Sequence, residues 1–309
     1  MRTTFRSTPA WLMAGLMVLA GCGDKTPRQA IARETDSTNV VVGVEPESTT
    51  GSSVTPAPIV PASFAEADAA FREKRYDEAV AGFAAFTTRR PLNPWGFHML
   101  GLSAWKAGDL TGAEGAFKAA LTLDSTHIRS YLNLSRVLIE SGQPDSAMGY
   151  LNTVLGIDET FGEAYRLIGR VHDAKGELDE AVTAYHEALS LDSTDVWSMN
   201  NLGLVLIHQG AFDDALRPLA RAVELSPEVG TFQNNLGIAL ERTGHFSAAA
   251  DAYRAALATD SSFTKAQVNL SRVSGLKEDP NTPPVDLKVL SQEFGRQIDA
   301  SQNDESEDC

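Results

Sequence analysis

The chain has 309 residues, of which 41 are acidic and 26 basic, so its formal net charge at pH 7 is −15. This balance argues against nucleic acid or an anionic lipid surface as the main partner of the surface as a whole. The two cysteines, Cys22 and Cys309, are too few for a disulfide framework.

The first 22 residues combine basic residues, a short apolar run and a cysteine. Arg2 and Arg6 precede an apolar run, 11–20, that is too short to span a bilayer and stay there. The run ends in Leu19-Ala20-Gly21-Cys22, which resembles the lipobox of bacterial lipoproteins. This resemblance implies that residues 1–21 are a signal peptide and that Cys22 is lipidated. The alternative is an ordinary secretory signal with a chance cysteine.

Residues 22–59 comprise that cysteine and a segment rich in Ser, Thr, Pro and charge, with little periodicity. This composition predicts a disordered tether. Gly23 follows the cysteine, whereas an aspartate in that place is linked to retention in the inner membrane among lipoproteins. We therefore expect a protein of the bacterial cell envelope, lipid-anchored to the outer membrane and facing the periplasm.

A period of 34 residues runs through the chain from residue 60. Six alanines keep this spacing: Ala79, Ala113, Ala147, Ala181, Ala215 and Ala249. Five glycines precede five of these alanines by five residues: Gly108, Gly142, Gly176, Gly210 and Gly244. Lys74 stands where the sixth glycine is expected. A fixed period in this range indicates a stacked repeat.

The columns resemble the tetratricopeptide repeat (TPR) family, with Asn-Leu-Gly at 201–203 and 235–237 followed by glycine, alanine and an aromatic residue. The resemblance implies an all-α fold, a right-handed α-solenoid of six helix-turn-helix repeats. These repeats are expected at 60–93, 94–127, 128–161, 162–195, 196–229 and 230–263, with a capping helix at 264–277. Since one repeat cannot bury its apolar stripe alone, stability should come from stacked neighbours.

The sequence lacks the motifs that catalysis would need. It contains no phosphate-binding glycine loop, no His-Glu-x-x-His, no cysteine pairs at metal-binding spacing and no Gly-x-Ser-x-Gly. The six histidines occupy six different repeat positions. We therefore expect no enzyme activity, no cofactor and no metal.

In the TPR family, first helices line a concave groove, and repeat positions 2, 6, 9 and 13 form one stripe along it. Position 6 supplies Asn133, Asn201, Asn235 and Asn269. These resemble the asparagine ladder with which some members hold an extended peptide, since an amide both donates and accepts. Ordinary family sequence without a ligand is the alternative. Trp95 and Trp197 at position 2 are candidate anchors.

The stripe is basic within an acidic protein, with eight basic and three acidic residues in 28 positions. The candidate basic binding residues of the stripe are Arg136, Arg170, Arg242 and Arg272, and Arg166 beside the stripe is added to them. Arg166 and Arg170 resemble one side of the carboxylate clamp that holds a peptide C-terminus in chaperone-binding members. Thr231 and Asn235 depart from that clamp, which needs cations in their place. Solvated arginines on a helix face are the alternative.

These features predict a membrane-anchored scaffold or adaptor whose groove binds a protein or an extended, possibly acidic, peptide during assembly of envelope complexes. No nucleic acid partner is expected. Two alternatives use the same surface. One is binding of an anionic glycan or peptidoglycan fragment, and the other is delivery of substrates to an envelope protease.

Residues 278–309 carry nine acidic and two basic residues, with a cluster at 304–308. This composition predicts a mostly disordered acidic tail. The tail is either a solubiliser or a competitor for the basic groove, with Arg136, Arg166, Arg170 and Arg272 as contacts.

Overall fold

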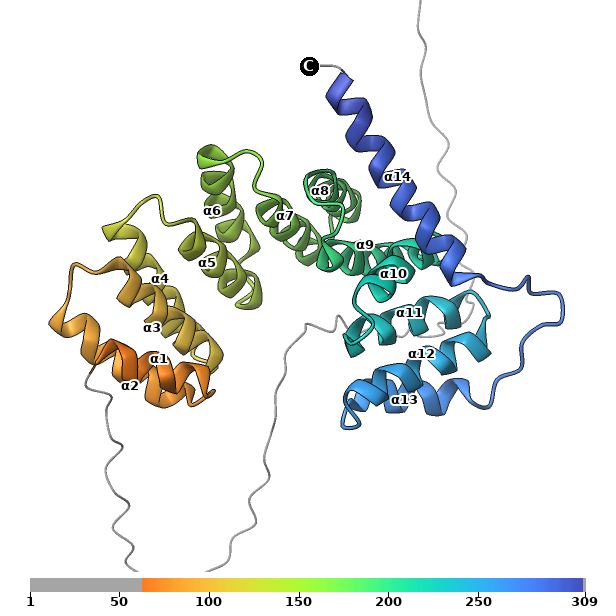
Figure 1. Ribbon diagram of the computed structural model, residues 1–309, viewed down its shortest axis with the longest axis horizontal. Helices are drawn as coiled ribbons and strands as arrows, with labels where there is room; N and C mark the ends of the chain where they lie inside the picture. The colour runs from red at the N-terminus through yellow and green to blue at the C-terminus, as the bar shows by residue number, and fades with distance from the viewer. Residues whose placement is uncertain (1–62, 308–309) are drawn as a thin grey trace, which may run out of the picture. The chain divides into compact units, whose positions relative to one another are not determined.

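The computed structural model describes residues 63–307, with side chains up to residue 300. The predicted signal peptide, the predicted lipobox with Cys22 and the predicted tether lie outside the described residues, as does Cys309. The described part is entirely helical and contains fourteen helices without a strand. They are arranged as pairs that follow one another in chain order (Figure 1).

The first helices of the successive repeats are α1 (Phe64–Arg72), α3 (Pro94–Lys106), α5 (Ile128–Glu140), α7 (Gly162–Lys175), α9 (Val196–Gln209), α11 (Gly230–Arg242) and α13 (Thr264–Val273). The second helices are α2 (Tyr76–Arg89), α4 (Leu110–Leu123), α6 (Pro144–Ile157), α8 (Leu178–Leu191), α10 (Phe212–Leu225) and α12 (Phe246–Thr259). A last helix, α14 (Leu287–Glu307), follows a connection of thirteen residues, 274–286.

The turn between the two helices of a repeat requires a left-handed backbone. Gly176 has a φ of 78° and Gly210 a φ of 82°, at the C-terminal ends of α7 and α9. Glycine adopts this conformation without steric cost. In the first repeat Lys74 takes the position, with a φ of 61°. The turn is therefore kept where the sequence departs from the glycine column.

The alanine column packs the two helices of each repeat together. All six alanines are fully buried. A small residue on the first helix faces a bulky one on the second: a Cβ added to Gly237 would lie 2.5 Å from Cε1 of Tyr253. The 34-residue period therefore reflects close helix pairing, and the predicted α-solenoid of TPR-like repeats is confirmed.

Successive repeats contact each other mainly through the second helix of one repeat and the first helix of the next, and to a smaller extent through their first helices. Helices α3, α5, α7, α9 and α11 each contact the next first helix in the series. Successive second helices, within residues 63–307, make no contact of comparable extent. This asymmetry places the first helices on the inner side of the bend between repeats, as the resemblance implied.

The C-terminal segment is a correction to the sequence analysis. Residues 278–309 were expected to be mostly disordered, but 287–307 form α14. Leu287, Leu290, Phe294 and Ile298 recur at intervals of three, four and four, which gathers them on one helix face. The acidic composition of the tail hid this apolar stripe, and its burial against the array supplies the free energy that orders the segment.

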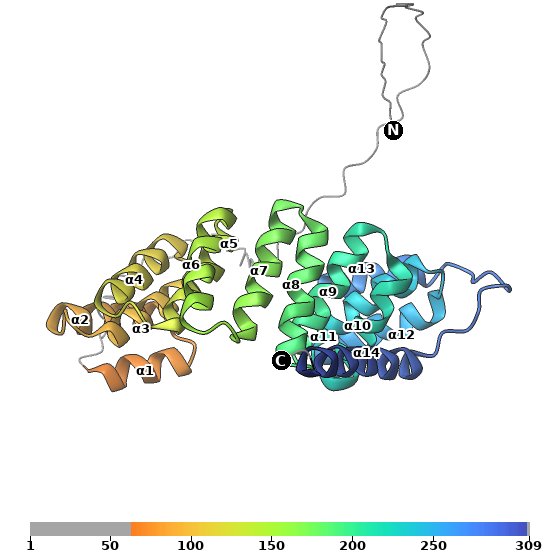
Figure 2. The same ribbon diagram turned by 90° about the horizontal axis from the view of Figure 1, so that it is seen from above.

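Helix α14 packs on the second helices α10 and α8 (Figures 1 and 2). Residues 287–300, the part of α14 whose side chains are described, therefore do not lie in the basic groove. The acidic cluster at 304–308 lies where no side chains are described.

Candidate binding face

The predicted site residues all lie on the first helices, so we call this set the first-helix face. It comprises Trp95, Asn133, Arg136, Arg166, Arg170, Trp197, Asn201, Asn235, Arg242, Asn269 and Arg272. They fall into three groups: a chain of charges, a relay of asparagine amides, and two tryptophans that lie apart on α3 and α9.

The first group is a chain of alternating charges across α5, α7 and α9. Arg136 and Arg166 both contact Glu163 Oε1, through Nη2 of each arginine. Nη1 of Arg166 also donates to both carboxylate oxygens of Asp195, at 2.7 and 2.8 Å. Asp195 in turn accepts hydrogen bonds from the backbone N–H groups of Trp197 and Ser198 and so caps α9. The charges therefore tie three successive repeats together.

Arg170 is the cation of this group that lacks a counter-ion. It is half-buried on α7, and the described residues offer it no ion pair or hydrogen bond. Burial, followed by the charges of Arg166 and Arg170, lowers the pKa of Arg136 to about 10. Three arginines share two carboxylates here, so one positive charge is left over, and geometry assigns it to Arg170.

The predicted half-clamp of Arg166 and Arg170 is thus only partly open. Asp195 already neutralises Arg166, while Arg170 is free to meet an added carboxylate. Sequence reasoning missed Asp195 because it belongs to the turn before α9 and not to the stripe. Asp195 stands directly before the apolar start of α9, where an aspartate commonly caps a helix, so the sequence did indicate its capping role.

The second group is a relay of five asparagine amides across α13, α11 and α9. Asn269 Nδ2 donates to Asn234 Oδ1 at 3.0 Å, and Asn235 Nδ2 donates to Asn200 Oδ1 at 2.9 Å. Within each helix, Asn234 donates to Asn235 at 3.4 Å and Asn200 donates to Asn201 at 3.3 Å. The relay therefore runs continuously from Asn269 to Asn201.

The relay changes what the ladder residues can do. Asn235 is buried, and its amide both donates and accepts within the relay. Among the ladder residues of the relay, only Asn201 and Asn269, at its two ends, are half-exposed and within reach of a ligand. Asn133 stands apart, and its Oδ1 accepts a hydrogen bond from Arg136 Nη1 at 2.6 Å. Asn200 and Asn234 were missed by stripe counting, although the doubled asparagines at 200–201 and 234–235 signalled them.

At the C-terminal end of the face, Arg272 is engaged by Glu241. Its Nε and Nη2 donate to the two carboxylate oxygens, each at 2.7 Å, and Nη2 also donates to Asn269 Oδ1 at 3.0 Å. Burial alone would raise the pKa of Glu241, but hydrogen bonds from Arg272 and Tyr253 outweigh it and the pKa is lowered. Arg242 instead lies over the ring of Phe212, 5.7 Å from its centroid.

The third group comprises the two tryptophans, which are exposed but held in place. Trp95 is 39% exposed and stacks on His98, with ring centroids 4.9 Å apart and an interplanar angle of 20°. Trp197 is 51% exposed and meets Phe232 edge-on at 5.0 Å. A rigid exposed indole loses little conformational entropy on binding, so both are suited to act as anchors.

His98 beneath Trp95 is fixed by a serine that it shares with a second histidine. Ser130 Oγ lies 3.0 Å from His98 Nδ1 and 2.8 Å from His127 Nδ1. Burial, with smaller effects of His127 and Arg129, lowers the pKa of His98 to about 4. His98, which stacks beneath the Trp95 ring, is therefore neutral at physiological pH.

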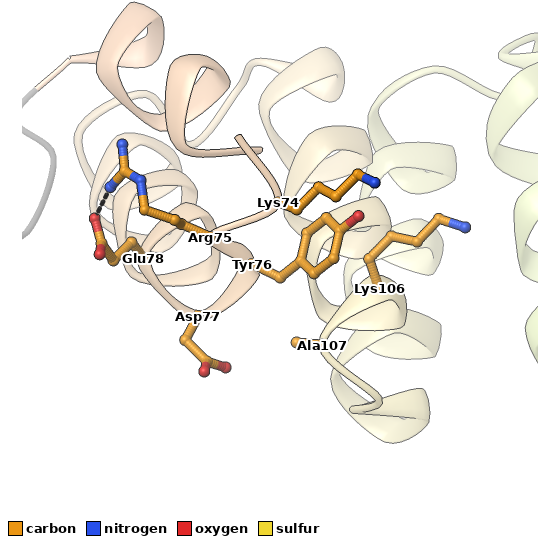
Figure 3. Close-up of a pocket in the computed structure, with 7 residues that line it drawn as sticks. All are labelled: Lys74, Arg75, Tyr76, Asp77, Glu78, Lys106 and Ala107. Carbon is orange, nitrogen blue, oxygen red and sulfur yellow. Dashed lines mark hydrogen bonds and ion pairs between the residues drawn. The ribbon is translucent and has the colours of Figure 1, made fainter. Parts of the chain in front are cut away.

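A surface hollow between the first two repeats is lined by Lys74, Arg75, Tyr76, Asp77, Glu78, Lys106 and Ala107, with Arg75 turned toward Glu78 (Figure 3). Across residues 63–307, no cluster of three or more His, Cys, Asp or Glu has the arrangement of a metal site. Over the same residues, no helix has the length and apolar character that crossing a membrane requires.

Sequence comparison accounts for the repeats. Profiles described as tetratricopeptide repeat match residues 104–171 and 200–263, and one described as TPR repeat matches 169–210. Together they span 104–263, more than half of the 309 residues. These are tetratricopeptide repeats. No curated protein matches the chain.

Solved structures share the fold of this TPR array. TTC0263, a thermophilic TPR protein of Thermus thermophilus, is 18% identical, with a TM-score of 0.54 over 59% of this chain and 100% of its own. The Cut9–Hcn1 structure of the APC/C is 17% identical, with a TM-score of 0.58 over 75% and 52%. PilF of Pseudomonas aeruginosa is 16% identical, with a TM-score of 0.51 over 66% and 90%. At these identities the likeness concerns the fold alone.

A TPR fold suggests a protein–protein interaction scaffold, and TPR proteins are generally non-catalytic. The membrane anchor, the partner and the pathway are separate matters that this fold does not decide.

Proposed function

We propose that the protein is a lipid-anchored TPR scaffold whose first-helix face binds an extended, acidic segment of a partner protein during assembly of an envelope complex. The observation that carries this proposal is Arg170, a half-buried cation without a counter-ion next to Arg136 and Arg166, which are both paired with carboxylates. A partner carboxylate at this point would complete a charge-assisted hydrogen bond.

The rest of the face supports an extended ligand. Asn201, at the end of the amide relay, also forms a hydrogen bond with the Tyr185 side chain. Because an amide has two N–H groups and two acceptor lone pairs, Asn201 can still donate to or accept from a peptide group of any sequence. Trp197 stands one helical turn before Asn201, and Trp95 lies two repeats before Arg170 on the same set of first helices. The spacing favours a segment that crosses several repeats over a compact small molecule.

The proposed location rests on the sequence before residue 60. Lipidation at Cys22 would hold the protein at the outer membrane, and the tether would let the array face the periplasm. A tether of about 37 residues spans about 35 Å root-mean-square, so the array can work away from the lipid surface.

Site-specific photo-crosslinking in native membranes tests the binding face. A photoreactive residue at Trp197 of the full chain should capture a partner, whereas one at Arg254, on the second helix α12, should not. Arg170→Gln should weaken capture from position 197 by roughly tenfold or more, in line with the loss of one charge-assisted bond. Equal capture from both positions, or full capture with Arg170→Gln, would contradict the proposal.

A second candidate is an anionic glycan, favoured by the two exposed tryptophans, whose ring faces could stack on sugar rings. It is separable from the first, because glycan binding should tolerate Asn201→Ala while peptide binding should not. Delivery of substrates to an envelope protease would use the same surface and would appear as a protease among the crosslinked partners.

A further inference from the structure

The turn between α2 and α3 has a charge and an apolar surface that differ from those of the later turns between repeats. Residues 79–108 contain no Asp or Glu, although 41 of the 309 residues of the chain are acidic. Within this stretch Arg89 and Arg90 are exposed, and so is Leu92. Leu92 is 81% exposed, the largest fraction among the exposed large apolar side chains of the described residues. The array therefore presents one basic turn with a protruding leucine.

The 34-residue period shows how far this turn departs from the others. At the place of Arg90, four of the five later turns have an aspartate, whose Oδ1 accepts the backbone N–H of a threonine or serine two residues further on. These pairs are Asp124–Thr126, Asp158–Thr160, Asp192–Thr194 and Asp260–Ser262. The remaining turn has Glu228 at the place of Leu92. Each later turn therefore carries a carboxylate, whereas the first carries two guanidinium groups.

The side chains of Arg90 and Leu92 are not needed to close the turn. Among the residues with described side chains, none forms an ion pair or a side-chain hydrogen bond with Arg90. Pro91 fixes its own φ, and Asn93 donates its backbone N–H to the carbonyl of Arg90 at 3.2 Å and caps α3 with its side chain. The backbone and the cap therefore hold the turn, and Arg90 keeps its charge for a partner outside the fold.

The turn lies where the array joins the N-terminal segment of the chain. Phe64, the first residue of α1, meets Phe86 of α2 with ring centroids 5.1 Å apart. The carbonyl of Phe86 in turn accepts the backbone N–H of Arg90 at 2.8 Å. The segment that carries Cys22 enters the array directly before Phe64. An anchor at Cys22 would therefore bring this turn close to the membrane before most of the array.

We propose that the α2–α3 turn, with Arg89, Arg90 and Leu92, is a membrane-contact site for anionic phospholipid headgroups, an inference that rests on the proposed anchor. The guanidinium groups would bind the phosphates, and Leu92 would enter the boundary between headgroups and acyl chains. Two arginines and one leucine bind a bilayer weakly by themselves, so the contact depends on the high local concentration that the tether provides. The carboxylates of the later turns would be repelled by the same surface. The first repeat would thus be held at the membrane and the later repeats away from it.

Photo-crosslinking on vesicles tests this site with the full chain, purified from bacterial membranes and reconstituted into vesicles that contain phosphatidylglycerol. The photoreactive residue replaces Leu92 or, as the matched control, Thr194, which has the same place in the turn between α8 and α9. Position 92 should capture phosphatidylglycerol at least about fivefold more often than position 194. Flotation of the vesicles measures attachment of the chain separately, so capture is expressed per attached molecule.

Charge variants show whether the arginines cause the capture. Arg90→Glu should lower lipid capture at position 92 by at least about fivefold, because it reverses a charge at the membrane surface. Arg254→Glu, on α12, changes the net charge equally and should leave capture unchanged. High salt, or phosphatidylcholine in place of phosphatidylglycerol, should also lower it.

Hydrogen exchange provides a measurement without a photoreactive group. Residues 89–97 should exchange more slowly on phosphatidylglycerol vesicles than on phosphatidylcholine vesicles. Leu92→Asp should remove this difference, whereas Val268→Asp, at a position of α13 that is 58% exposed, should keep it.

Three outcomes would overturn the inference. The first is equal lipid capture from positions 92 and 194 in chains that float with the vesicles. The second is capture at position 92 that neither Arg90→Glu nor neutral lipid reduces. The third is capture of a protein in place of lipid at position 92 in native membranes, which would make the turn a protein-binding surface. Flotation without capture contradicts the membrane contact alone, whereas a chain that does not float contradicts the proposed anchor and the contact with it.

Discussion

At the scale of single residues, the binding face is governed by how its polar groups satisfy one another. Three arginines of the first-helix face are already paired with carboxylates: Arg136 and Arg166 with Glu163, and Arg272 with Glu241. The excess of basic residues seen in the sequence is therefore partly neutralised within the fold. Arg170 is the half-buried cation that remains for a partner.

His98 should make the stability of the array depend on pH. It is 3% exposed and its pKa falls to about 4 in the fold, whereas an unfolded histidine titrates near 6.5. Between these values the unfolded state binds more protons, so the free energy of unfolding decreases as the pH falls from 6.5 toward 4. Between pH 7.5 and 5 the loss from this group should be about 2 kcal/mol.

Urea unfolding at pH 7.5 and 5 measures this loss. His98→Asn should show a smaller pH-dependent decrease than wild type, while His208→Asn, an exposed histidine on α9, should keep the wild-type decrease. If the free energy of unfolding of His98→Asn decreased as much as that of wild type, protonation of His98 would not be the cause of the pH dependence.

Cys22 carries the proposed anchor. Cys22→Ala should leave a folded protein that no longer partitions with membranes, because lipidation needs the thiol and no helix among residues 63–307 could replace it as a span. Fractionation after a salt wash measures this partition. Pelleting of the variant with membranes would mean that something other than Cys22 holds the protein there.

At the scale of helices, the spacing of small residues decides how closely partners approach. Gly237 of α11 faces Tyr253 of α12 at a distance that leaves no room for a methyl group. Gly149, in the middle of α6, has no atom within 4 Å of the place of its Cβ. The two glycines therefore predict opposite effects of the same substitution.

Gly237→Ala should lower the free energy of unfolding by about 1–3 kcal/mol, because the new methyl forces Tyr253 to move. Gly149→Ala should raise it by about 0.5–1 kcal/mol, because alanine loses less backbone entropy in a helix. Denaturant unfolding of both variants compares them directly. Stabilisation by both would show that the paired helices are not in close contact at Gly237.

At the scale of the whole described array, stability is a sum over neighbouring repeats, and α14 adds to that sum only where it docks. Helix α14 contacts α10 and α8 and leaves the first three repeats without any such cover. Its removal should consequently act on the C-terminal half of the array and not on the N-terminal half.

Phe294→Ala should increase hydrogen exchange in α8 and α10 by an amount corresponding to about 3 kcal/mol, while α2 and α4 keep their protection. Val289→Ala on the exposed side of α14 should leave all four helices unchanged. A uniform increase along the array after Phe294→Ala would mean that the repeats unfold as one unit.

The sequence by itself determined the repeat period, the helix pairs and the first-helix stripe, because alanine, glycine and leucine spacing reports contacts within one repeat and between neighbours. Only the tertiary structure decided how far each polar side chain is used. From the sequence, Asn235 is expected to be an exposed ladder residue that is available to a peptide. In the structure it is buried in the relay, and the sequence could not show this because its partner Asn200 lies on another helix. Likewise, the apolar stripe of α14 does not reveal by itself that it packs on α10 and α8, because that contact joins Ser291 to Glu224 across 67 residues of chain.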